Sequence, residues 1–124
     1  MTTLAQVVED LLASRTWTPD TVVFRCDTIS RIFARRCREA GIDAQVLRLG
    51  PARGPLPRMH AKWRRMVGTS DGTGECDGHH VVLVHGLVHD FTFLQFDHEA
   101  SVPHVSTLEQ IHLAWDGMEA VPST

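Results

Sequence analysis

The sequence predicts an α+β domain in which an antiparallel β-sheet packs against an N-terminal helix that carries a cysteine. Three observations lead to this prediction. Apolar residues recur at helical spacing twice before residue 41, apolar runs at 81–84 and 87–96 flank a short turn, and a long loop separates the two regions. The chain has 124 residues, which is enough for a single domain, 1–124, with a core of its own.

Two helices are expected in the first third of the chain. Residues 3–14 are predicted to form an amphipathic helix, followed by a turn at 16–20 and a short extended segment at 21–25. A second helix is expected from Cys26 to Ala40, and Gly41 is typical of a helix end. Its apolar stripe consists of Ile29, Ile32, Phe33, Cys37 and Ala40.

A strand and a long loop are expected next. Residues 42–49 alternate loosely between apolar and polar, which predicts a strand. Residues 50–78 are rich in Gly, Pro, Arg and Ser. We predict a long basic loop there, with a short helix at 59–66, and loops of this length in a compact domain are usually functional or mobile.

A hairpin and a last helix complete the predicted domain. His85-Gly86 is expected to form the turn between strands at 81–84 and 87–96. Ser106 and Glu109 have the spacing of a capping box, which predicts a helix over about 107–115.

The sequence contains no sign of a membrane span, a signal peptide or a disulfide framework. No apolar run approaches the ~18 residues that a membrane helix needs, and no basic stretch followed by an apolar run opens the chain. The three cysteines are an odd number and are expected to be reduced. We therefore expect a cytoplasmic protein with at least one free thiol.

Charge is unevenly distributed along the chain. Residues 1–70 hold all twelve Lys and Arg against six acids, whereas residues 71–124 hold nine acids and seven of the eight histidines. A histidine among carboxylates holds its proton more firmly, which suits an imidazolium paired with a thiolate. The simpler interpretation is one basic face and one acidic face.

Cys26 is the candidate nucleophile among the three cysteines. It opens the second predicted helix, and the positive end of a helix lowers the pKa of a thiol. Asp27 favours the helix start but slightly opposes ionisation of that thiol. Cys37 lies on the apolar stripe of the same helix and is interpreted as structural. Cys76 lies in the long loop, where it could react without being catalytic.

The length of the hairpin turn decides which histidine faces Asp90, because side chains alternate along a strand. With a two-residue turn at His85-Gly86, Val81 pairs with Asp90, and His79 shares their face as a diagonal neighbour about 5–8 Å away. A three-residue turn with Gly86 in a left-handed bulge would place His80 opposite Asp90. We favour the two-residue turn and therefore His79.

These segments resemble the transglutaminase-like branch of the papain-like thiol enzymes. The resemblance covers 26–49 and 79–96, about a third of the chain, and includes a cysteine at a helix start and Ala-Gly-Ile-Asp-Ala at 40–44 before a strand. In that family a histidine strand turns through an Asx-Gly pair and returns to Asp-Pro-Thr. Here His85-Gly86 and Asp90-Phe-Thr92 occupy those places, and shortening both arms by two residues again selects His79.

The resemblance implies a Cys26–His79–Asp90 triad acting on amides. Cys26 would attack the acyl carbon, His79 would take and return the proton, and Asp90 would orient the imidazole. The oxyanion would meet the backbone N–H of Cys26 and a further donor, with Trp17 and Gln95 as weaker candidates at the site. No metal and no cofactor is implied.

Several reactions share the acyl-enzyme that this triad implies. Protease, protein-glutamine deamidase and transglutaminase-type chemistry all pass through it, so we expect a hydrolase or acyl transferase acting on a peptide or protein amide. Small stand-alone domains of this type resemble the catalytic ends of bacterial effector toxins. The basic loop 50–66 is a candidate docking segment for an acidic substrate.

Three other classes of function compete with this interpretation. Cys76-x-x-His79 and His85-x-x-x-His89 have zinc-like spacing, although no second Cys-x-x-Cys completes a ligand set. Residues 44–70 carry six basic residues and no acid, but no nucleic-acid-reading motif accompanies them. Finally, the family glycine two residues before the cysteine is Phe24 here, and no upstream glutamine supplies an oxyanion donor. A non-catalytic binding or assembly module of the same fold is therefore the remaining alternative.

Overall fold

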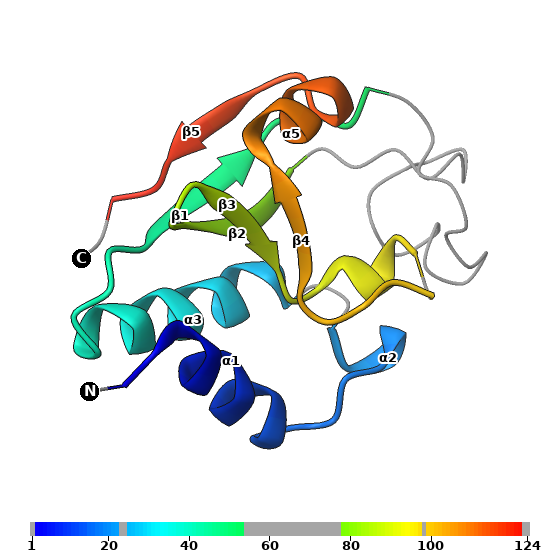
Figure 1. Cartoon of the computed structure of the whole chain (residues 1–124). Coiled ribbons are helices and arrows are strands. Elements are labelled where there is room, and N and C mark those ends of the chain that lie inside the picture. Colours follow the sequence, from blue (N-terminus) through cyan, green and yellow to red (C-terminus); the bar gives the residue numbers. More distant parts are fainter. Residues whose placement is uncertain (1, 23–24, 54–77, 98, 123–124) are drawn as a thin grey trace.

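The fold is α+β, with a five-stranded antiparallel sheet whose strands lie in the order β4-β3-β2-β1-β5 (Figure 1). The computed structural model describes residues 2–22, 25–53, 78–97 and 99–122. Its elements in chain order are α1 (Leu4–Ala13), α2 (Pro19–Val22), α3 (Cys26–Glu39), β1 (Gln45–Leu49), β2 (His79–Val84), β3 (Leu87–Asp90), the 3₁₀ helix η1 (Phe93–Gln95), β4 (His104–Thr107), α5 (Leu108–Ala114) and β5 (Met118–Ala120).

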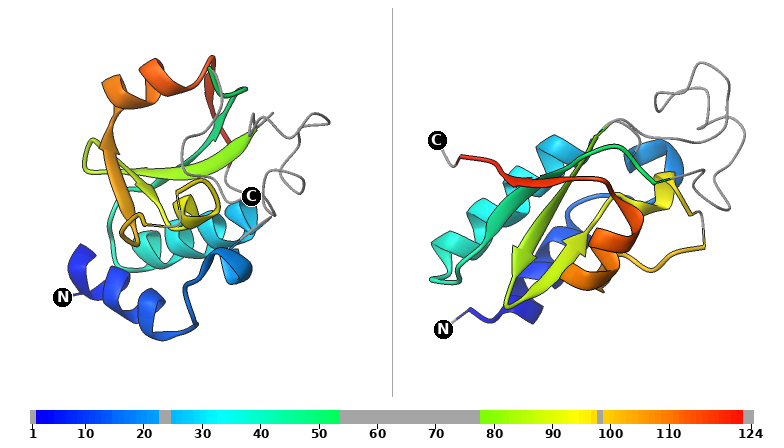
Figure 2. Two further views of the ribbon diagram at one scale, coloured as in Figure 1. Left: turned by 90° about the vertical axis from the view of Figure 1, so that its right-hand side faces the viewer. Right: turned by 90° about the horizontal axis from the view of Figure 1, so that it is seen from above.

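Helices cover both faces of the sheet (Figures 1 and 2). Helix α3 packs against β2 and β1 on one face, with α1 beside it, and α5 packs against β4 and β3 on the other face. Each face has its own apolar cluster, centred on Phe33 on the α3 side and on Phe96 and Trp115 on the α5 side. The predicted packing of the sheet against the cysteine-bearing helix is confirmed.

Helix α3 begins at Cys26 as its sequence predicts and ends at Glu39, one residue before the predicted end at Ala40. Ile29, Phe33 and Cys37 are buried at four-residue spacing, so one stripe of the helix faces the sheet. The helix ends at Glu39, and Gly41 follows with φ of +78°, a left-handed conformation that favours glycine. At the other end, Arg25 is the N-cap and its side chain makes no capping hydrogen bond.

The β2–β3 hairpin has the predicted two-residue turn. Val84 pairs with Leu87, and both turn residues have positive φ, +51° at His85 and +75° at Gly86. Positive φ at both central residues is the requirement of a type I′ turn, which matches the twist of the flanking strands. This register, and not the bulged alternative, fixes the direction of every side chain in the hairpin.

Four parts of the predicted secondary structure are wrong. Residues 19–22 form the single helical turn α2 instead of a turn and an extended segment. The strand expected over 87–96 ends at Asp90, because the backbone N–H of Thr92 turns back to donate to the Asp90 carboxylate (2.9 Å). Strands β4 and β5 were not expected; they pair with β3 and β1 respectively.

The long loop predicted at 50–78 lies mostly outside the described residues, together with its predicted helix at 59–66 and Cys76. Of that segment, the structure describes 50–53 and Gly78, and Ala52 forms an isolated bridge with Trp115. Within the described ranges, no helix is long and apolar enough to cross a membrane.

The N-cap of α5 lies one residue later than the sequence pattern indicates. Thr107 caps the helix and Gln110 completes a reciprocal capping box, with the Gln110 N–H donating to Thr107 Oγ1 (3.1 Å) and the Thr107 N–H to Gln110 Oε1 (2.8 Å). Ser106 lies in β4, paired with Val88. The expected pair Ser106 and Glu109 is therefore wrong.

The position of the α5 N-cap can be tested directly. Thr107→Ala is expected to lower the free energy of unfolding by about 1 kcal/mol, because it leaves a helix N–H without its side-chain acceptor. Ser106→Ala is the matched control and is expected to have a much smaller effect. Urea unfolding followed by circular dichroism measures both, and a larger loss for Ser106→Ala would contradict the Thr107 cap.

Candidate active site

The Cys26 thiol lies at the first residue of α3 and faces the beginning of β2. Its sulfur is 3.8 Å from Nδ1 of His80, and the Cys26 side chain is partly buried. The first N–H groups of a helix have no intrahelical acceptor, so the thiol lies at the positive end of the helix. The sequence-predicted placement of Cys26 at a helix start is confirmed.

His79 and Asp90 meet on the opposite face of the sheet from His80. Nε2 of His79 donates to Oδ2 of Asp90 over 2.6 Å, and the two side chains are 1% and 7% exposed. The two-residue turn placed these residues on one face, as the strand alternation predicts. With Nε2 engaged, Nδ1 is the ring nitrogen of His79 that is left for another partner.

Both histidines interact with the same thiol. The 3.8 Å contact of the sulfur is with His80 Nδ1, and hydrogen bonding from both His79 and His80 lowers the pKa of the thiol. The β2–β3 pairing ends at Val82 and His89, so the start of β2 lies beyond the paired ladder. We infer that the absence of β2–β3 pairing at the start of β2 allows Cys26, at the start of α3, to lie close to that strand.

Electrostatics favour a thiolate at Cys26. Burial alone would raise the pKa of the thiol, but the hydrogen bonds from His79 and His80 and the positive charge of His79 outweigh burial and lower the pKa to about 6. Cys37 provides a contrast on the same helix. It is fully buried without such partners, and burial raises its pKa to about 11.

The charge of His79 is maintained chiefly by Asp90. Burial opposes protonation of the imidazole, yet the Asp90 charge and hydrogen bond, with a smaller contribution from Cys26, raise the His79 pKa to about 10. A thiol pKa near 6 and an imidazole pKa near 10 describe an ion pair, Cys26 thiolate and His79 imidazolium, over the range between them.

Asp90 is itself held by a short polar chain that includes Gln95. Oδ1 of Asp90 accepts from the backbone N–H of Thr92 (2.9 Å) and from its hydroxyl (3.3 Å). The buried amide of Gln95 donates to that hydroxyl (3.1 Å). Gln95 therefore stabilises the position of Asp90 through the Thr92 hydroxyl. It was expected to contact the substrate or the oxyanion instead.

Aromatic rings enclose the imidazole of His79. Trp115 stacks on it at 5.5 Å between centroids, and Phe96 meets it edge-on at 4.7 Å. Trp115 was not predicted as a site residue, because the sequence around it does not indicate which strand the C-terminal end of α5 packs against. Trp17, the aromatic expected at the site, lies between α1 and α2, where its indole N–H donates to Leu12 O (2.9 Å) and its ring contacts Phe91.

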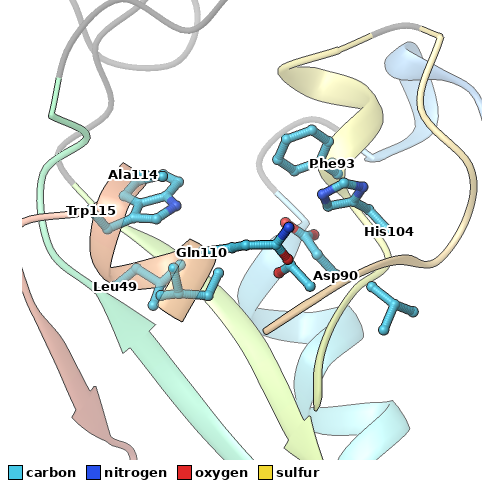
Figure 3. A pocket seen from close by; sticks show the side chains of 10 residues that line it. Leu49, Asp90, Phe93, His104, Gln110, Ala114 and Trp115 are labelled. Carbon is cyan, nitrogen blue, oxygen red and sulfur yellow. The ribbon is translucent and has the colours of Figure 1, made fainter. Parts of the chain in front are cut away.

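A cavity of about 200 Å³ adjoins the His79–Asp90 pair on the α5 side (Figure 3). Asp90 and Trp115 both line it, and Phe93 and His104 stack on each other at 4.1 Å on its far wall. Gln110 extends between these walls (Figure 3). Since a dry cavity of about 150 Å³ can hold one benzene ring, this cavity has room for a single side chain.

No protein-family model, curated protein or solved structure matches this chain. The decisive features are a partly buried thiol at a helix start, a histidine 3.8 Å from its sulfur, and a second histidine that lowers the thiol pKa and lies 2.6 Å from a buried carboxylate.

The zinc alternative finds no support in the part of the chain that the structure describes. No group of three His, Cys, Asp or Glu side chains there could hold a metal ion. His85 is exposed in the hairpin turn, whereas His89 is buried against Phe33 of α3. The zinc-like spacing of those two histidines therefore joins one exposed and one buried ring, and Cys76 lies outside the described residues.

Proposed function

We propose that this protein is a thiol-dependent hydrolase or acyl transferase that acts on an amide through Cys26, His79 and Asp90. The observation that carries the proposal is the paired environment of the thiol. His79, oriented by Asp90 at 2.6 Å, stabilises the thiolate and lowers the Cys26 pKa to about 6. A thiolate at neutral pH is what nucleophilic attack on an acyl carbon requires.

The steps follow from these positions. His79 holds the thiol proton as its imidazolium, and the Cys26 thiolate attacks the acyl carbon to form a tetrahedral intermediate. The intermediate's oxyanion forms near the start of α3, where the N–H of Cys26 lacks an intrahelical acceptor and can donate to it. The leaving amine takes up a proton at the site as the C–N bond breaks, which leaves a thioester on Cys26. Water or another amine then attacks the thioester, and the C–S bond breaks to release the thiolate. Peptide hydrolysis and deamidation both end with water and differ in the amide that Cys26 attacks, whereas transfer ends with another amine.

The arrangement supports the resemblance to the transglutaminase-like branch of the papain-like enzymes. A cysteine begins the helix that packs on an antiparallel sheet, and the histidine and aspartate come from adjacent strands. We further propose a peptide or protein amide as the substrate, with acidic groups that dock on the basic segment 50–66. The reduced thiol that this chemistry needs agrees with the expected cytoplasmic residence.

The pH dependence of Cys26 alkylation tests the proposal. Iodoacetamide reacts with the thiolate, so the rate at Cys26 is expected to rise through a midpoint near pH 6, the thiol pKa. It is then expected to stay level until His79 loses its proton near pH 10. Mass spectrometry that resolves each cysteine measures the rate, which separates Cys26 from the other two thiols.

Cys37 is the internal control, because its pKa of about 11 predicts no reaction at neutral pH in the folded protein. A Cys26 midpoint near pH 8.5, the value of an ordinary thiol, would contradict the enzyme proposal. The non-catalytic binding module of the same fold would then be the better description.

A further inference from the structure

The two histidines that contact Cys26 differ in their access to solvent. His79 is 1% exposed, lies between Trp115 and Phe96, and uses Nε2 for Asp90. The ring of His80 is 19% exposed. Its Nδ1 is 3.8 Å from the Cys26 sulfur, and its Nε2 on the other side is 3.9 Å from Asp27, whose side chain is half exposed. His80 thus connects the sulfur to solvent, and His79 does not.

Resting on the acyl-enzyme function proposed above, we propose that His80 is a second catalytic histidine, which moves protons between the reacting acyl group and solvent. His79 has a different role: it keeps its proton throughout the cycle and serves as the fixed positive partner of the thiolate. The physical basis for this division is that the two rings leave β2 on opposite faces: the His80 ring lies 3.8 Å from the sulfur, and the His79 ring is bound to Asp90 and stabilises the thiolate.

His79 is poorly suited to exchange its proton during turnover. Burial opposes its charge, but Asp90 is the largest contribution that raises its pKa to about 10, ahead of Cys26. The proton therefore stays on His79 even after the thiolate has been consumed in the thioester. A general acid works best when its pKa is near the operating pH, and a buried imidazolium also has no direct path to water.

The surroundings of His80 supply a partner for its outer nitrogen. Asp27 follows the nucleophile in α3, and its carboxylate is held by Arg31 over 2.7 Å, with His80 Nε2 3.9 Å from the same oxygen. Arg48 is the cross-strand neighbour of His80 on β1 and pairs loosely with Glu119 at 3.7 Å. The outer side of His80 therefore faces a solvated group of charges.

The proton steps then balance without any further reactant. In acylation, the imidazolium of His80 gives the proton on Nδ1 to the leaving amine as the C–N bond breaks and the C–S bond forms. In deacylation, Nδ1 of the now neutral His80 takes a proton from water as its oxygen bonds to the acyl carbon. The C–S bond breaks, the electron pair returns to sulfur as the thiolate beside His79, and the carboxylic acid product loses its proton to solvent.

Burst kinetics with 4-nitrophenyl acetate test this role at about pH 8, where the Cys26 thiol (pKa about 6) is ionised. Nitrophenolate leaves without a proton, so acylation of this probe does not need His80, and the solvent-exposed ring gives its proton to solvent before it acts as the base in deacylation. In His80→Gln, the burst is expected to remain within a few-fold of wild type, while steady-state deacylation falls about 10²-fold. His112→Gln, an exposed histidine on α5, is the matched control and is expected to match wild type.

Imidazole rescue distinguishes a proton carrier from a structural residue. Added imidazole is expected to restore deacylation in His80→Ala, because the vacated site is open to solvent, but not in His79→Ala, whose site is buried. A wild-type deacylation rate in His80→Gln, or a slow rate in His80→Ala that imidazole leaves unchanged, would overturn the role of His80 alone. Absence of a burst in the wild-type protein would instead contradict the proposed function itself.

Discussion

Asp90→Asn is expected to move the midpoint of Cys26 alkylation from about pH 6 to about pH 9 or above. Asp90 is the largest contribution that keeps the buried His79 charged. Without the carboxylate, burial dominates and His79 becomes neutral. The thiol then loses the imidazolium that lowers its pKa, while its own burial still raises that pKa.

Asparagine also selects the wrong tautomer of His79. Its Oδ1 can still accept from the Thr92 N–H, so the local turn is expected to persist. Its amide N–H₂ then faces Nε2 of His79, where the carboxylate accepted before. A neutral ring that accepts at Nε2 carries its proton on Nδ1 and cannot take the thiol proton there. We therefore expect acylation by 4-nitrophenyl acetate near pH 7 to fall by about 10²–10⁴-fold.

The alkylation midpoint is a better measure of this effect than a single rate, because a thiolate of higher pKa is individually more nucleophilic (Brønsted coefficient of about 0.4–0.5). Asp43→Asn, an exposed carboxylate in the loop between α3 and β1, is the matched control and is expected to keep the midpoint near pH 6. An unchanged midpoint in Asp90→Asn would rule out Asp90 as the source of the His79 charge.

The part of the site that the sequence could predict is the part determined by local geometry. Strand alternation and turn length are short-range properties, so they placed His79 and Asp90 on one face of the hairpin. The helix start at Cys26 is likewise local. The contact of His80 with the sulfur is not local. Strand alternation predicts the face of the sheet on which the His80 side chain lies. It does not predict that the β2–β3 pairing ends at Val82, or that the His80 ring reaches the Cys26 sulfur.

The elements that the sequence did not predict all form through contacts between residues far apart in the chain. Strands β4 and β5 are four and three residues long, and each exists because it extends an edge of the sheet. Such short strands have little alternation of their own to detect. The stacking of Trp115 on His79 depends in the same way on where α5 reaches after β4 has paired with β3.

The packing of α3 on the sheet is expected to depend most strongly on Phe33. Its side chain is 0% exposed and contacts the rings of Phe91 (4.6 Å) and His89 (5.7 Å) beneath β2 and β3. Phe33→Ala removes these contacts and leaves a cavity in the cluster that joins α1, α3 and the sheet. Such a change is expected to lower the free energy of unfolding by about 3–5 kcal/mol.

Urea unfolding followed by circular dichroism measures this loss, with Phe33→Leu as the matched control at about 1.5 kcal/mol or less. Helix α3 also carries Cys26, so Phe33→Ala is expected to loosen the contact between the sulfur and the start of β2. In the fraction that stays folded, the Cys26 midpoint should then rise above pH 6. A variant that loses stability but keeps that midpoint would mean that the start of α3 is held by the histidines themselves and not by the core beneath the helix.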